Sequence, residues 1–126
     1  MKKWMIAIIL LASIGLQQTT LASELMDKFA IRITVIANQV VYEWEYDSPN
    51  KYEFEKGDKI VRGSEAQNEV ERMVSLLALK EGADVAEMVK ILKKNGFEEI
   101  ERLDIRMMNG EGKLFTWVWD KSLQKS

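Results

Sequence analysis

One stretch, from Ser64 to Gly96, has the sequence of two consecutive α-helices and is flanked on both sides by strand-like sequence. Apolar residues recur there at intervals of three and four, so each helix has one stripe to bury. The two stripes are Val70, Met73, Val74 and Leu77, then Val85, Met88, Val89 and Leu92. A helical pair this short is marginal on its own. The pair must therefore pack against the flanking strands.

Capping motifs set the predicted ends of both helices. The predicted starts are two capping boxes, Ser64 with Gln67 and Asp84 with Glu87. Gly82 is expected to take the left-handed conformation that closes the first helix near Lys80. The second helix is expected to close at Asn95-Gly96, directly after two lysines that suit a helix C-terminus.

Before the helices, alternation of apolar and polar residues predicts strands over Phe29–Ala37 and Val40–Tyr46. A two-residue turn at Asn38-Gln39 would join them and place both apolar sets on one face. That register predicts the cross-strand pairs Ile33 with Trp44, Val35 with Tyr42, and Arg32 with Glu45. Apolar pairing and charge pairing favour the same hairpin.

A third strand is predicted through Tyr52 and Phe54, with Tyr52 opposite Tyr46. The segment Gly57-Asp58 is expected to bend or bulge this strand before Ile60-Val61 leads into the helices. Four glutamates, Glu43, Glu45, Glu53 and Glu55, then lie on the solvent face of the sheet.

After the helices, Leu103, Ile105 and Met107 alternate with charged residues, and Asn109-Gly110 is a strong hairpin signal. A two-residue turn there would place Ile105 opposite Leu114 on the last strand. It would also put Phe115, Trp117 and Trp119 on the outer face beside Arg102 and Arg106, an arrangement typical of binding hot spots. The alternative is a three-residue turn or a bulge, which would turn the aromatic residues inward.

This order, β-β-β-α-α-β-β, predicts an α+β fold in which a helical pair packs on one face of an antiparallel sheet of about five strands. Residues 24–126 contain no repeat or linker and are expected to form a single small domain.

Residues 1–23 have the features of a bacterial secretory signal peptide: Lys2 and Lys3, an apolar run from Trp4 to Leu16, and a cleavage motif at Thr20-Leu21-Ala22. The apolar run is short for a membrane span. An uncleaved N-terminal anchor is the alternative interpretation. The protein is therefore expected to be secreted or extracytoplasmic, with a membrane contact only if this segment is retained.

Composition excludes several classes of function. The formal charge is -2 and becomes about −4 without the signal segment, which argues against nucleic-acid binding. The chain has no histidine and no cysteine, so Ser-His and Cys-His catalysis and almost all zinc sites are excluded. No cofactor motif, calcium loop or phosphate loop is present. We therefore expect no cofactor and no metal.

The sequence favours a non-catalytic binding module that engages a protein, peptide or cell-wall polymer through an open sheet face. The expected contact residues are Phe115, Trp117, Trp119, Arg102 and Arg106. A homo-oligomer is compatible with this surface. Two alternatives remain: a small carboxylate-dependent hydrolase acting on glycan, and a membrane-anchored accessory or regulatory domain.

Overall fold

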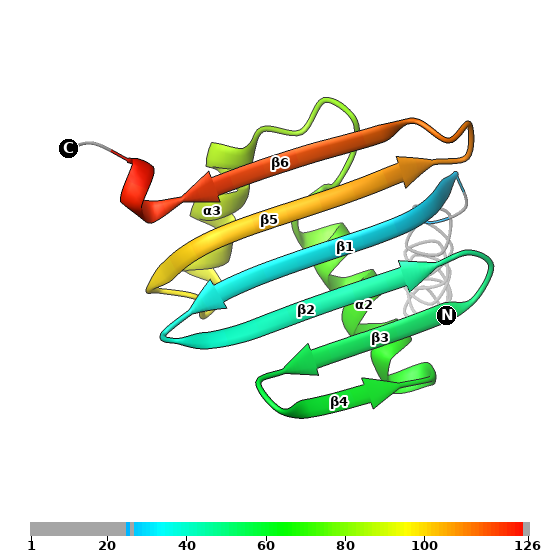
Figure 1. Cartoon of the computed structure of the whole chain (residues 1–126), viewed down its shortest axis with the longest axis horizontal. Coiled ribbons are helices and arrows are strands. Elements are labelled where there is room, and N and C mark those ends of the chain that lie inside the picture. Colours follow the sequence, from blue (N-terminus) through cyan, green and yellow to red (C-terminus); the bar gives the residue numbers. More distant parts are fainter. Residues whose placement is uncertain (1–24, 26, 125–126) are drawn as a thin grey trace, which may run out of the picture.

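The structure is a computed structural model that describes residue 25 and residues 27–124. It has the predicted α+β fold, with one antiparallel sheet and both helices on the same face (Figure 1). The strands are β1 (Lys28–Ala37), β2 (Val40–Asp47), β3 (Lys51–Lys56), β4 (Lys59–Arg62), β5 (Ile100–Asn109) and β6 (Leu114–Asp120). The helices are α2 (Ser64–Leu76), α3 (Val85–Lys94) and the short 3-10 helix η1 (Lys121–Leu123). The predicted signal segment, residues 1–23, lies outside the described residues.

The sheet has six strands in the order β4-β3-β2-β1-β5-β6, one more than the five expected. The additional strand is β4, which pairs with β3 so that Phe54 lies opposite Val61. Gly57-Asp58 is therefore a chain reversal, not a bend within one strand. Gly57 has a φ of 58°, a left-handed conformation that glycine adopts without steric cost.

The N-terminal hairpin has the predicted register. Ile33 lies opposite Trp44, Val35 opposite Tyr42, and Arg32 opposite Glu45. Asn38 and Gln39 form the two-residue turn with φ values of 52° and 64°. Two consecutive positive φ values are those of a type I′ turn, whose twist matches the twist of the flanking strands. Tyr52 also lies opposite Tyr46, as predicted.

Both helices bury the predicted stripes, with Val85 only partly buried. Of the two predicted capping boxes, only the N-cap bond of the second forms, and its Glu87 pairs with Lys90 instead. Asp84 accepts a hydrogen bond from the Ala86 amide at 3.1 Å. In α2, Gly63 occupies the N-cap position without a side-chain bond, because the helix already begins at Ser64. Helix α2 closes at Leu77 and not near Lys80. Ala78, with a φ of 48°, supplies the left-handed residue that was expected at Gly82. Helix α3 ends at Asn95-Gly96, as predicted.

The core lies between the helices and the sheet. Leu77 and Leu92 from the helical region belong to the same buried cluster as Ile33, Trp44 and Ile105 from the sheet. Each of these side chains is at most 2% exposed. This packing supplies the burial that two short helices need. Among the described residues, no helix combines the length and the apolar character needed to cross a membrane.

The C-terminal hairpin has the register of the three-residue turn, the alternative given above, and not that of the two-residue turn. Ile105 lies opposite Trp117, not Leu114, and Met107 lies opposite Phe115. The Asn109 amide donates to the Lys113 carbonyl at 3.0 Å, so the turn contains three residues between them. A change of register by an odd number of residues reverses which side chains face the core. Phe115, Trp117 and Trp119 consequently face the helices.

Candidate functional site

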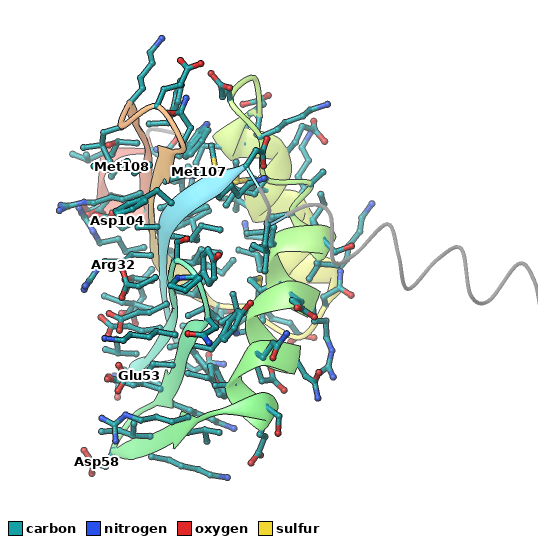
Figure 2. The ribbon with its side chains drawn as sticks, turned by 90° about the vertical axis from the view of Figure 1, so that its right-hand side faces the viewer. Arg32, Glu53, Asp58, Asp104, Met107 and Met108 are labelled. Carbon is teal, nitrogen blue, oxygen red and sulfur yellow. The ribbon has the colours of Figure 1, made fainter. Side chains whose placement is uncertain are left out.

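The candidate site is the sheet face opposite the helices, which we call the open face. No described element covers it, and Arg32, Glu53 and Asp104 point away from the helices (Figure 2). Buried side chains such as Met107, 2% exposed, belong to the other face. An uncovered face of a six-stranded sheet leaves its side chains free to contact another molecule.

A row of charges crosses the open face from strand to strand. Cross-strand partners in this row are Arg62, Glu53, Glu45, Arg32 and Arg106, from β4 to β5. The Arg32 guanidinium is 2.9 Å from the Glu45 carboxylate, and the Arg62 guanidinium is 3.0 Å from the Glu53 carboxylate. The row therefore presents two acids in its centre, each held by an arginine on its outer side.

Like charges also lie directly opposite one another on this face. The like-charged partners are Glu43 with Glu55, Glu45 with Glu53, and Arg32 with Arg106. Such pairs destabilise a sheet when nothing else compensates them. Ion pairs offset this cost for Glu45 and Glu53 and for Arg32 and Arg106. No ion pair among the described residues involves Glu43 or Glu55, so the electrostatic cost falls mainly on that pair.

The acidic pairs alter proton affinity. Burial, followed by a hydrogen bond with Glu53, raises the pKa of Glu45 above its usual 4.5, against the opposing effect of Arg32. Partial burial, with the charges of Glu43 and Glu53, raises the pKa of Glu55 as well. Each glutamate therefore holds a proton more tightly than a solvated carboxylate does.

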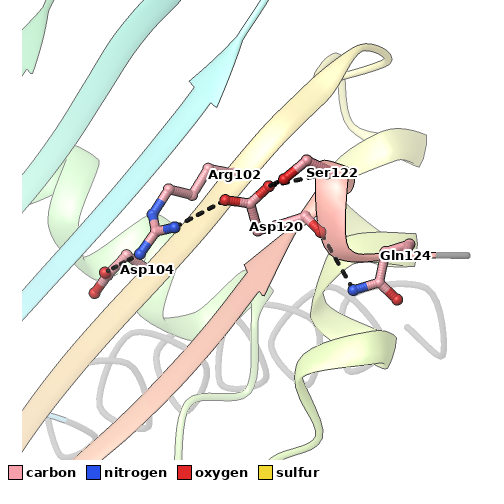
Figure 3. A network of polar contacts seen from close by, with 5 residues as sticks. All are labelled: Arg102, Asp104, Asp120, Ser122 and Gln124. Carbon is pink, nitrogen blue, oxygen red and sulfur yellow. Dashed lines mark hydrogen bonds and ion pairs between the residues drawn. The ribbon is translucent and has the colours of Figure 1, made fainter.

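At the other side of the open face, Arg102 connects β5 to β6 (Figure 3). Its guanidinium is 2.9 Å from the Asp120 carboxylate and 3.4 Å from that of Asp104. The Asp120 carboxylate also accepts from the Ser122 hydroxyl at 2.7 Å. Bonds from Ser122, followed by those from Arg102, lower the pKa of Asp120. Arg102 is thus held by contacts within the chain. Arg106 is also paired, 3.6 Å from the Asp104 carboxylate, but its side chain is 64% exposed.

A hollow of about 340 Å³ opens at the Glu45–Glu53 pair and is also lined by Asp47, Tyr52 and Arg62. The two carboxyl side chains are 19% and 25% exposed. Glycosidases use two carboxyl groups, and the one that acts as general acid has a raised pKa, as Glu45 has here. For metal binding the described residues contain no suitable group of three or more ligating side chains.

A second hollow, of about 390 Å³, lies between α2 and the helix-facing side of β2 and β3. Its walls include Tyr42, Trp44, Phe54 and Phe97, whose rings contact one another; the Tyr42 and Phe97 centroids are 5.1 Å apart. The Trp44 Nε1 is buried in this wall without a hydrogen-bond partner. The aromatic wall is apolar, but Lys56, Glu69 and Arg72 also line the hollow. No local sequence pattern reveals this hollow, because it forms only when α2 packs on the sheet.

The structure separates the five residues predicted to form one contact surface. Arg102 and Arg106 lie on the open face. Trp117, together with its neighbours Phe115 and Trp119, packs partly buried against the core on the helix side. The Trp117 indole donates to the Ala83 carbonyl at 2.8 Å. The expectation that these aromatic residues share a face with the two arginines is wrong. A binding role for the aromatic residues stays a prediction, but the shared face on which it was based does not exist.

Comparison of the chain with known protein families, curated proteins and solved structures finds no match.

Proposed function

We propose that this protein is an exported bacterial envelope or extracellular domain that binds a partner through the open face and catalyses no reaction. The observation that carries the proposal is the set of like-charged cross-strand pairs on an uncovered sheet. Pairs that weaken a fold are retained when they contribute to something other than folding, and binding sites are the usual case.

The charge order indicates the kind of partner. Along the row of charges, acids occupy β2 and β3, and arginines occupy β1, β5 and β4. A partner that relieves both kinds of repulsion must carry charges of both signs in complementary positions. Protein or peptide surfaces meet this requirement better than an uncharged glycan does. We therefore favour a protein or peptide over a cell-wall polymer.

The test is a charge reversal that should improve the fold and impair binding. Glu55→Lys converts the Glu43–Glu55 repulsion into an attraction, so the free energy of unfolding should rise by about 0.2–1 kcal/mol. Crosslinking in the envelope fraction, followed by mass spectrometry, should identify a partner of the wild-type protein. The yield of that adduct should fall with Glu55→Lys and with added salt.

The matched control is Glu81→Lys, which makes the same charge change on an exposed residue between the helices. It should leave both stability and adduct yield near the wild-type values. An adduct whose yield is equal in all three proteins would exclude the open face as the binding surface.

A carboxylate-dependent hydrolase acting on glycan is a second candidate, favoured by the raised pKa of Glu45 beside Glu53 in the 340 Å³ hollow. In this case one carboxyl group would protonate the leaving oxygen and the other would act as nucleophile or base. Release of new reducing ends from cell-wall glycan should then be lost in both Glu45→Gln and Glu53→Gln. Absence of release by the wild-type protein would remove this candidate.

A further inference from the structure

The two edges of the sheet differ in how well they are protected. Strand β4 is four residues long and has Lys59 and Arg62 at its ends, features that discourage pairing with another chain. Strand β6 is seven residues long and carries no charge or proline from Leu114 to Trp119. Both strands are outermost in the sheet (Figure 1). One edge is thus protected by its sequence and the other is not.

Strand β6 also has apolar side chains on both faces. On the open face, Leu114 is 56% and Val118 is 45% exposed. On the helix side, Phe115, Trp117 and Trp119 are only partly buried. Apolar residues on both faces are typical of strands that are covered on both faces. Strand β6 therefore has the sequence of a covered strand, although its open-face side chains are exposed and it lies at the edge of the sheet.

The hydrogen bonds of the hairpin show which backbone groups of β6 are available. The Asn109 amide donates to the Lys113 carbonyl, and backbone groups alternate in direction along an antiparallel strand. The groups of Phe115 and Trp117 therefore point to β5. Those of Leu114, Thr116 and Val118 point away from the sheet, where an added strand would pair with them.

The side chains of β6 are self-complementary about Thr116. In an antiparallel pairing of two copies, with Thr116 opposite Thr116, Leu114 of one copy lies opposite Val118 of the other, and Phe115 lies opposite Trp117. Aliphatic residues thus meet aliphatic residues, and aromatic residues meet aromatic residues, pairings that stabilise antiparallel strands. The central residue is one whose backbone groups point outward, as this register requires.

We propose that β6 pairs with β6 of a second copy, centred on Thr116, so that the two sheets join into one continuous sheet with two-fold symmetry. An isologous contact of this kind closes on itself and gives a dimer, not a fibre. The partner is a second copy because the order aliphatic, aromatic, Thr, aromatic, aliphatic is symmetric about its own centre.

Sedimentation of the purified protein over a concentration series tests the dimer. The wild-type protein should have twice the mass of one chain. Thr116→Lys places a charge at the pairing edge, and Thr116→Pro removes an outward-pointing donor while leaving the bonds to β5 intact. Both variants should be monomeric with an unchanged circular dichroism spectrum. The matched control Thr34→Lys, in the centre of the same face, should remain dimeric.

Crosslinking tests the register. The natural chain has no cysteine, so Thr116→Cys provides a single thiol at the proposed two-fold axis. Opposed residues in a hydrogen-bonded antiparallel pair lie about 5.5 Å apart, within reach of a disulfide. Mild oxidation should convert most of this variant to a covalent dimer, whereas Ile60→Cys on the β4 edge should remain largely monomeric.

A monomeric wild-type protein would overturn the proposal, as would a dimer that persists in Thr116→Lys or crosslinks equally through Ile60→Cys. Capture of an extended peptide by a monomer through β6 would assign this edge to a different partner and would likewise overturn it. None of these outcomes depends on whether the open face binds a separate protein.

Discussion

Leu77 is part of the buried core between the helical layer and the sheet. It ends the α2 stripe, is 2% exposed and belongs to the core cluster. Leu77→Ala should lower the free energy of unfolding by about 2–5 kcal/mol, because it removes buried contacts and leaves a cavity. Chemical denaturation measures the change. The surface variant Glu69→Ala should shift it by no more than about 0.5 kcal/mol; equal midpoints would contradict the packing described.

The glutamates of the open face should give stability an unusual dependence on pH. Glu55 has a pKa raised above 4.5 by burial and by its acidic neighbours, so the folded state binds its proton more tightly than the unfolded state does. Its contribution to stability is therefore greatest at acid pH and declines as pH rises from about 4.5 through the raised pKa. Asp120, whose pKa is lowered from 3.8, contributes in the opposite sense and loses its contribution as pH falls.

Glu55→Gln removes the pH dependence that the raised pKa of Glu55 gives to stability. Its midpoint of chemical denaturation should exceed that of the wild-type protein at neutral pH, and the advantage should shrink toward pH 4.5. Glu81→Gln provides the control at an exposed site. An advantage for Glu55→Gln that grows as pH falls would show that the sign assigned to this group is wrong.

Part of the open face could be predicted from individual residues. Alternation placed Glu43, Glu45, Glu53 and Glu55 on the solvent side, and the match of Tyr52 with Tyr46 already implied that these acids oppose one another. Their raised pKa could not be predicted, because it depends on how much solvent the neighbouring side chains exclude. Arg62 was also missed as the partner of Glu53, since β4 was not expected as a separate strand.

At the level of elements, the β1–β2 turn has an unfavourable residue at one position. Gln39 has a φ of 64°, a region that costs non-glycine residues about 1 kcal/mol or more. Gln39→Gly gives the Asn-Gly pair that type I′ turns prefer and should raise the free energy of unfolding by about 0.5–1 kcal/mol. Thermal and chemical denaturation both measure this increase in stability. Gln39→Ala keeps the strain and should show no gain; a gain for both variants would point to a different cause.

The two hairpins show why one register could be predicted and the other stayed open between two alternatives. For β1 and β2, the turn length, the apolar pairs and the Arg32–Glu45 pair all indicated the same register. For β5 and β6, Asn109-Gly110 indicated a two-residue turn, but Gly112, with a φ of 84°, supplies the left-handed position instead. The Gly110 amide donates to the Asp27 carbonyl, a long-range contact that no local pattern reveals.

At the level of the whole molecule, export remains a prediction, and it specifies where the mature chain should begin. Cleavage after the Thr20-Leu21-Ala22 motif should give an N-terminus between about Ala22 and Glu24. Leu25, 5% exposed, belongs to the core, so processing at this site would leave the folded domain intact. N-terminal sequencing of protein recovered outside the cytoplasm checks this. A full-length species confined to the cytoplasm would contradict it.

The position of β1 in the sheet has a consequence for how the chain acquires its structure over time. Strand β1 pairs on one edge with β2, the next strand in the chain. On its other edge it pairs with β5, which begins only at Ile100. Closing so long a loop is entropically slower than forming a local hairpin. During refolding, pulsed hydrogen exchange should therefore protect the β1 amides that pair with β2 before the β1 amides that pair with β5. Simultaneous protection would show instead that the sheet forms in one step. If β1 pairs with β5 late, the folding chain passes through a stage in which one edge of β1 is unpaired, and an unpaired strand edge makes that stage the one most prone to aggregation.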